Sequence, residues 1–203
     1  ARGIADALLI GEQFVGSDDV CLVLGDNIFY SPDFECYLNK ALSLGGGACV
    51  FGYYVDDPRA FGVVEFDEQG RAVSIEEKPR YPKSNYIVPG LYFYDNDVME
   101  IAHNLKPSAR GELEITDVNL EYLRRGKLHV VKLDRDFVWL DAGTAENLLD
   151  SAQEVKRVQD ETGRYIACLE EIAYQRGYIS HHTLMRHAAD LNKTLYGRYL
   201  ECL

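Results

Sequence analysis

The stretch Val20-Cys21-Leu22-Val23-Leu24-Gly25-Asp26-Asn27 joins an apolar run to a polar end. Five consecutive apolar residues are typical of a strand that is buried on both faces of an α/β sheet. Such sheets bind ligands beyond the carboxyl ends of their strands, and a glycine there lets other groups approach the backbone. We therefore predict a buried strand at 20–24 with a candidate ligand site at Asp26. For this tripeptide alone, a simple turn or cap remains the alternative.

Strand and helix patterns alternate around this stretch, and hairpin-like strands follow in the middle of the chain. We predict an α/β fold with a mixed, mostly parallel sheet over residues 1–144. From residue 145 only helical patterns recur, which indicates a helical C-terminal region at 145–203. The predicted helices are 4–14, 33–44, 95–105, 116–125, 145–160, 169–176, 180–189 and 193–203. The predicted strands are 20–24, 48–55, 61–66, 72–76, 86–94 and 128–133, the last leading toward 137–140.

The composition excludes several classes of function. With 33 acidic and 21 basic residues the formal charge is -12, which repels nucleic acid and anionic membranes. The five cysteines never fall at C-x-x-C spacing, and no apolar run approaches the ~18 residues of a membrane span. We expect a cytoplasmic protein with reduced thiols. A phosphate-bearing small substrate stays possible, because a divalent metal can reverse the local field between carboxylates.

The beginning of the chain is unusual. Ala1-Arg2-Gly3 carries no initiator Met and runs directly into a helical pattern. This indicates a chain that is entered midway.

Two carboxylates each follow a strand-like run. Asp26 ends the run at 20–24, and Asp141 follows the aromatic and apolar residues 137–140. Together they could supply the few carboxylate ligands that Mg²⁺ takes from a protein, with phosphate oxygens and water completing its shell. Taken alone, Asp141 would more simply cap the next helix.

Two cations are candidates for phosphate binding. Lys78 lies in Glu76-Glu77-Lys78-Pro79, where Pro79 favours an extended conformation at Lys78, and Glu77 could accept hydrogen bonds from sugar hydroxyls. Arg110 lies beside a flexible glycine, a setting that suits bidentate phosphate binding. A solvated charged turn and an exposed loop arginine are the alternatives. The five histidines show no metal spacing, and no motif of nucleophilic hydrolysis or dinucleotide binding occurs.

Seven short segments of the sequence resemble the bacterial glucose-1-phosphate thymidylyltransferases of the sugar-1-phosphate nucleotidyltransferase family. They occur in the same order as in that family and at nearly the same spacing. They are VLGDN at 23–27, FGVVE at 61–65, EEKP at 76–79, KSNY at 83–86, GLYFYD at 90–95, RGELEITD at 110–117 and WLD at 139–141. The resemblance implies a Rossmann-like nucleotidyltransferase sheet. It implies the reaction of dTTP with glucose 1-phosphate to give dTDP-glucose and pyrophosphate, a step of nucleotide-sugar biosynthesis in the dTDP-rhamnose pathway. A homo-oligomer, specifically a homotetramer, is also implied.

The same resemblance assigns roles to residues. It implies that Asp26 and Asp141 bind Mg²⁺ and that Lys78 and Arg110 hold the sugar phosphate, so that these four form the catalytic set. The residues that it places against the substrates are Gly3, Asp6, Gly62, Glu77, Val88 and Gly90.

Departures from the family pattern bear on specificity and activity. Asp6 stands where the family has a glutamine that reads thymine, and an ionised carboxylate only accepts hydrogen bonds. Phe61, Pro89 and Ala142 replace a tyrosine and two threonines. The family's glycine-rich loop, with its arginine and lysine, has no counterpart in the 203 residues. We therefore expect impaired or absent turnover from this chain alone. The alternatives are a related uridylyl- or cytidylyltransferase and a non-catalytic sugar-phosphate-binding or assembly module.

Overall fold

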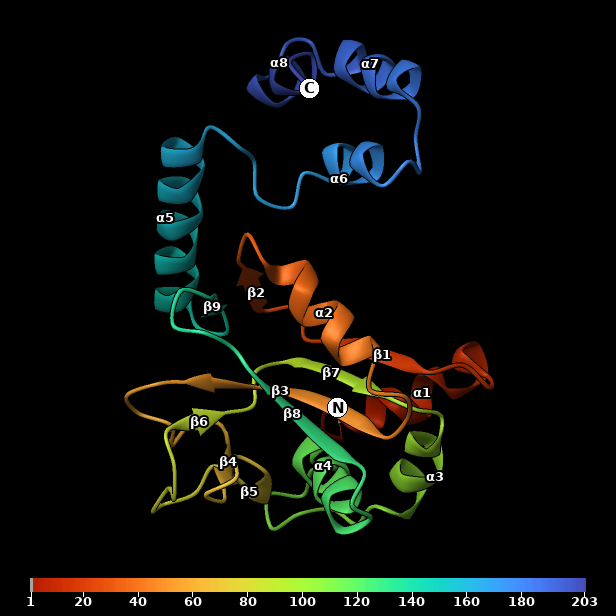
Figure 1. Ribbon diagram of the computed structural model, residues 1–203, viewed down its shortest axis with the longest axis vertical. Coiled ribbons are helices and arrows are strands. Elements are labelled where there is room, and N and C mark those ends of the chain that lie inside the picture. The colour runs from red at the N-terminus through yellow and green to blue at the C-terminus, as the bar shows by residue number, and fades with distance from the viewer. Residues whose placement is uncertain (1) are drawn as a thin grey trace. The chain divides into compact units, whose positions relative to one another are not determined.

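The computed structural model describes residues 2–203, which divide into two compact units. The first unit runs to Ser151 and the second covers Ala152–Leu203. The boundary falls inside helix α5 (Ala145–Thr162), whereas the sequence prediction placed it before that helix (Figure 1).

The elements follow the predicted order closely. The helices of the first unit are α1 (Asp6–Val15), α2 (Phe34–Leu42), α3 (Asp97–Asn104) and α4 (Ile115–Arg124). Its strands are β1 (Val20–Val23), β2 (Asn27–Tyr30), β3 (Ala48–Tyr54), β4 (Gly62–Phe66), β5 (Ala72–Glu77), β6 (Tyr86–Ile87), β7 (Leu91–Tyr94), β8 (Leu128–Lys132) and β9 (Val138–Asp141). Beyond α5, the second unit contains α6 (Leu169–Gln175), α7 (His181–Asp190) and α8 (Leu195–Leu200).

The main sheet is mixed, as predicted, but its pairing corrects one expectation. Its strand order is β1-β7-β3-β6-β4-β5, with β8 on the other side of β3. Strands β1, β3 and β8 run in one direction, yet β7 is inserted antiparallel between β1 and β3. Among the described strands, β3 and β8 are therefore the one directly parallel pair. The prediction of a mostly parallel sheet is wrong for the hydrogen-bonded pairs, because β7 lies antiparallel between β1 and β3, and β6, β4 and β5 also pair antiparallel.

Strand β3 carries the core of the first unit on both faces. Ala48 and Val50 face a cluster built with α1, α3 and α4, whereas Cys49 and Phe51 face a cluster with α2 and β8. Successive side chains of a strand point to opposite faces, so an uninterrupted apolar run is needed here. The first unit is thus a sheet covered by helices on both sides (Figure 1).

Two strand predictions need correction at their edges. Strand β1 is not buried on both faces, because it pairs with β7 alone among the described strands and leaves Cys21 and Val23 exposed. The predicted strand 86–94 splits into β6 and β7, because Pro89 has no backbone N–H to donate to a ladder.

A second sheet of two strands was not predicted. Strands β2 and β9 pair antiparallel, and Asn27 lies opposite Asp141. The sequence prediction read a turn at 25–27 and no strand at 27–30, since four half-buried residues show no alternation. This pairing joins two segments that are far apart in the chain.

The second unit has a small core of its own. It contains Cys168, Leu184, Ala188 and Leu200. Two carboxylates accept hydrogen bonds from tyrosines at its margin: Glu170 from Tyr196, and Glu171 from Tyr199. In the described part of the chain, no helix combines the length and the apolar character that crossing a bilayer requires.

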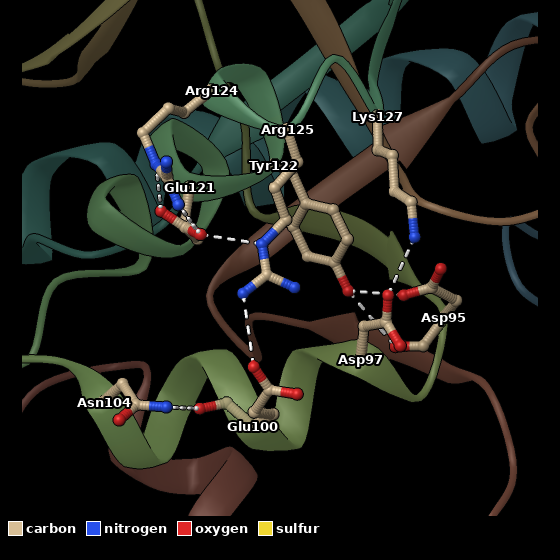
Figure 2. A network of polar contacts seen from close by, with 9 residues as sticks. All are labelled: Asp95, Asp97, Glu100, Asn104, Glu121, Tyr122, Arg124, Arg125 and Lys127. Carbon is tan, nitrogen blue, oxygen red and sulfur yellow. Dashed lines mark hydrogen bonds and ion pairs between the residues drawn. The ribbon is translucent and has the colours of Figure 1, made fainter.

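A polar network ties α3 and α4 to the sheet (Figure 2). The Asp95 carboxylate accepts from the Gly47 amide at 2.6 Å and from the Tyr122 hydroxyl at 2.6 Å. Gly47 has φ +81°, and a Cβ there would lie 2.3 Å from the Lys127 carbonyl oxygen, so that only glycine fits. Lys127 in turn donates to Asp97 at 2.9 Å. One carboxylate thus joins the start of β3 to helix α4.

We predict that Tyr122→Phe lowers the free energy of unfolding by about 1.5–3 kcal/mol, the range for a hydrogen bond to a charged group. Tyr122 is fully buried, and burial and the Asp95 charge both raise the pKa of its hydroxyl, which remains a donor. The matched control is Tyr178→Phe, because Tyr178 is 80% exposed. Urea unfolding of both variants provides the measurement, and equal midpoints would contradict the assigned role.

Candidate active site

A solvent-open cleft of about 210 Å³ lies in the first unit. The predicted residues Asp26, Gly62, Glu77, Lys78, Val88, Gly90 and Asp141 all line it. Residues with no predicted role also line it, among them Asn27, Glu114, Thr116 and Trp139. The structure thus brings together seven predicted residues from five separate segments.

Asp26 and Asp141 converge because β2 pairs with β9. The Asp26 carbonyl oxygen accepts from the Ala142 amide at 2.7 Å, which extends the ladder past Asn27. A Cβ on Gly143 would lie 3.0 Å from Asp141 Oδ1 and 3.3 Å from Asp26 Oδ2. Two carboxylate oxygens therefore face one small space that glycine leaves open. This arrangement fits a hard divalent cation that takes one or two protein carboxylates.

An aromatic wall closes the side of the cleft nearest β9. The Trp139 indole packs edge-on against Phe61, with ring centroids 5.3 Å apart, and against Tyr53 at 5.5 Å. Such edge-to-face pairs hold rings in fixed orientations. Trp139 and Asp141 lie two residues apart on β9, so the wall offers an apolar surface beside that carboxylate.

Glu77 is held in place by Thr116. The Thr116 hydroxyl donates to Glu77 Oε2 at 2.5 Å, across the floor of the cleft. A Cβ on Gly62 would lie 3.1 Å from Thr116 Oγ1 and 3.3 Å from Glu77 Oε2. Glycine at position 62 therefore leaves room beside the carboxylate for a hydroxyl of a ligand.

Arg110 lies at the rim and does not line the cleft. Its guanidinium lies 3.6 Å from Glu77 Oε1, 3.6 Å from Glu114 Oε1 and 3.2 Å from Glu112 Oε2. The side chain is 43% exposed, so each pair is weakened by solvent. Arg110 can thus exchange its carboxylate partners for an incoming phosphate.

Lys78 adopts a conformation that the sequence did not predict. Its φ is +44°, in the left-handed region, whereas Pro79 was expected to keep it extended. The Lys78 amide donates to the Phe61 carbonyl at 3.0 Å, and this bond turns the chain at the end of the β4–β5 ladder. Left-handed backbone in a non-glycine residue costs energy and often marks a functional site.

Gly3 and Asp6 do not line the cleft. A Cβ on Gly3 would lie 2.3 Å from the Leu113 carbonyl oxygen, so glycine permits close packing there. The Asp6 residue is 6% exposed, and its carboxylate accepts from Arg2 at 2.6 and 3.2 Å. Their role toward a base stays a prediction.

The cleft is acidic. Asp26, Glu77, Glu114 and Asp141 line it, and among the described lining residues Lys78 is the one cation. Burial, reinforced by the charges of Glu77 and Asp26, raises the pKa of the Tyr92 hydroxyl. Across residues 2–203, no group of three or more histidine, cysteine or acidic side chains could hold a metal. A cation at this cleft would thus depend on two carboxylates and on its ligand.

The sequence analysis assigned no role to Asn27, Thr116 or Trp139. All three belong to the quoted family strings, but their partners lie far away in the chain: Gly90, Glu77 and Phe61. Proximity to Asp26 and Asp141 was the one signal that could have singled out Asn27 and Trp139.

Comparison with known proteins gives consistent matches. The model of the nucleotidyl transferase family matches residues 1–158. A glucose-1-phosphate thymidylyltransferase of Neisseria gonorrhoeae is 54% identical over 198 residues, covering 98% of this chain and 69% of the relative. One from Mycobacterium tuberculosis is 52% identical, with 98% and 68% covered.

Solved structures agree with the fold. A Bacillus anthracis structure assigned as a glucose-1-phosphate thymidylyltransferase, in complex with a sucrose, superposes with a TM-score of 0.68 at 45% identity. It covers 76% of this chain, which spans 61% of that protein. A UDP-glucose pyrophosphorylase complexed with UDP-glucose gives a TM-score of 0.69 at 21% identity, which supports the fold alone. The predicted Rossmann-like nucleotidyltransferase fold and the resemblance are confirmed.

Proposed function

Because the chain belongs to the nucleotidyl transferase family and resembles its glucose-1-phosphate thymidylyltransferases throughout, we propose that the cleft serves transfer of a thymidylyl group from dTTP to glucose 1-phosphate. The products would be dTDP-glucose and pyrophosphate. The observation that carries the proposal is the convergence of Asp26 and Asp141 in a cleft that Lys78 also lines. The chain spans 69% of its Neisseria relative and 61% of the Bacillus structure, so the activity of the whole protein is part of the proposal.

In this reaction an oxygen of the sugar phosphate attacks the α-phosphorus of dTTP. The new O–P bond forms as the bond to pyrophosphate breaks, and catalysis consists of positioning and charge neutralisation. Glu77, held by Thr116, would accept from sugar hydroxyls in the space beside Gly62. Lys78 and Arg110 would hold the sugar phosphate, Arg110 by releasing Glu77 and Glu114.

The acidic pair fits Mg²⁺, which we propose as the cofactor. Asp26 Oδ2 and Asp141 Oδ1 would hold it in the space beside Gly143. When bound, Mg²⁺ would neutralise charge on phosphate oxygens. Without it, an acidic cleft in a chain of charge -12 would repel a triphosphate.

We expect Asp26→Asn and Asp141→Asn each to lower kcat at least 100-fold, roughly the loss for an electrostatic catalytic group, while leaving the fold intact. Each change removes a charge but little volume. Pyrophosphate release should be measured in the protein as its gene encodes it, over a series of Mg²⁺ concentrations. The control is Asp18→Asn in the exposed turn after α1. Near-native turnover at limiting Mg²⁺ would remove that residue from the metal site.

A second expectation concerns the base. If Asp6 approaches it, Asp6→Gln should increase the preference for dTTP over UTP and CTP by about 1 to 3 kcal/mol, the cost of an unpaired buried polar group. The change also breaks the Arg2 ion pair, so Arg2→Gln is the matched control. Competition assays give the preference, and a ratio unchanged by Asp6→Gln would exclude Asp6 from base recognition. A uridylyl- or cytidylyltransferase would instead prefer its own nucleotide before any substitution.

The second candidate function is a sugar-phosphate-binding module without turnover. It is favoured by the single cation that lines the described cleft. We expect these 203 residues alone to bind glucose 1-phosphate or dTDP-glucose weakly and to release no measurable pyrophosphate. Calorimetry and a coupled pyrophosphate assay on monodisperse protein separate binding from turnover. Turnover with dTTP and Mg²⁺ would show that the described residues suffice. A cytoplasmic location and a homo-oligomer stay predictions.

A further inference from the structure

Asn27 joins three separate parts of the cleft through one side chain. Its Nδ2 donates to Asp26 Oδ1 at 2.9 Å. Its Oδ1 accepts from the Gly90 amide at 2.9 Å and from the Trp139 indole Nε1 at 2.7 Å. The backbone of Asn27 lies opposite Asp141 in the β2–β9 pair. The residue thus contacts the acidic pair, the sugar-side backbone and the aromatic wall.

The chemistry of these contacts requires an amide. Two N–H donors face Oδ1 and occupy both of its lone pairs, while a carboxylate faces Nδ2. The opposite orientation would place the NH₂ group against two donors and the oxygen against a carboxylate. The amide is therefore locked in one orientation by its own partners.

The fixed orientation of the Asn27 amide also determines the orientation of the Asp26 carboxylate. Because Asn27 binds Oδ1, the other oxygen, Oδ2, faces the space beside Gly143 that Asp141 Oδ1 also faces. The rotation of the Asp26 carboxylate is thereby fixed by an uncharged donor. A neighbouring hydrogen bond that orients a metal-binding carboxylate typically contributes 10- to 100-fold to metal affinity.

The same amide fixes the opposite wall. Gly90 donates to Asn27 and its carbonyl accepts from the Leu24 amide at 2.9 Å, so the backbone there is held from both sides. A Cβ at Gly90 would lie 2.7 Å from the Leu24 side chain, which excludes other residues. The indole of Trp139 is aligned by its bond to Asn27 and by its contacts with Phe61 and Tyr53.

We propose that Asn27 is a positioning residue that couples the acidic pair to the sugar-binding wall. It aims the Asp26 carboxylate toward Asp141 and, through Gly90 and Trp139, sets the distance between the two halves of the cleft. The proposal rests on the proposed transferase function for its kinetic consequences, whereas its geometry can be tested without turnover.

The first test uses fluorescence of metal-free protein. Trp139 is the sole tryptophan of the sequence, so its emission reports on this site. Asn27→Ala removes the acceptor of the indole N–H and should shift the emission, whereas Asn27→Asp keeps two acceptor oxygens and should leave it near the wild-type value. The control is Asn104→Ala, an exposed residue at the end of α3. Equal emission of the wild type and Asn27→Ala would overturn the coupling to Trp139.

The second test follows metal and sugar separately. In the protein as its gene encodes it, Asn27→Ala should raise the Mg²⁺ concentration for half-maximal turnover roughly 10- to 100-fold. It should also raise KM for glucose 1-phosphate. Because Asn27 acts through Asp26, the Mg²⁺ effect should be absent from an Asp26→Asn background, as a double-mutant cycle reveals. Additive effects, or an unchanged Mg²⁺ requirement, would overturn the positioning role.

Two outcomes must be kept apart. If the wild-type protein turns over no sugar phosphate, the proposed function fails. The inference about Asn27 can then still be tested, because Trp139 emission gives the midpoint of a Mg²⁺ titration for the wild type and for Asn27→Ala. An equal midpoint in that titration would overturn the inference. If Asn27→Ala does not fold, Asn27→Asp takes its place, because it keeps two of the three hydrogen bonds. Its new carboxylate faces Asp26, so it should show lower turnover together with native Trp139 emission.

Discussion

The candidate site depends on one short pairing, that of β2 with β9. Each strand has four residues, and together they form a separate sheet beside the main one. The register opposes Asn27 and Asp141, and the Ala142 amide continues the ladder to the Asp26 carbonyl. Backbone hydrogen bonds therefore bring two acidic residues together against their mutual repulsion. Slipping the register by one residue would turn Asp141 to the other face and separate the pair.

The charge of the cleft follows from the same constraint. Two acidic side chains face the space at Gly143, and Glu77 and Glu114 lie near Arg110. Arg110 partly balances Glu77 and Glu114, whereas no cation among the described residues forms an ion pair with Asp26 or Asp141. An unbalanced pair of carboxylates disfavours an anionic ligand unless a cation accompanies it. The proposed divalent ion would offset the charge of this pair, and that argument rests on the described residues rather than on the resemblance.

Local pattern was sufficient to predict most elements and the segments that form the cleft. Apolar runs placed β3, β4 and β5 within two residues, and all eight predicted helices occur. The failures have common physical causes. Strand β2 depends on β9, a partner that is distant in sequence, and the left-handed backbone of Lys78 depends on its bond to Phe61. Thr116 owes its role to one long-range hydrogen bond and Asn27 to two, and no spacing rule encodes such bonds.

The division of the chain clarifies which of its residues the chemistry needs. Every residue that lines the cleft lies in the first unit, whereas the second unit has a separate core around Leu184 and Leu200. Within the first unit, the network at Asp95 fixes α4 to the sheet. The first turn of α4 contains Thr116, the residue that holds Glu77. The stability of this network and the position of Glu77 are therefore linked through one helix. A loosened α4 would displace the Thr116 hydroxyl, and with it the Glu77 carboxylate, without acting directly on the β2–β9 pair that joins Asp26 to Asp141.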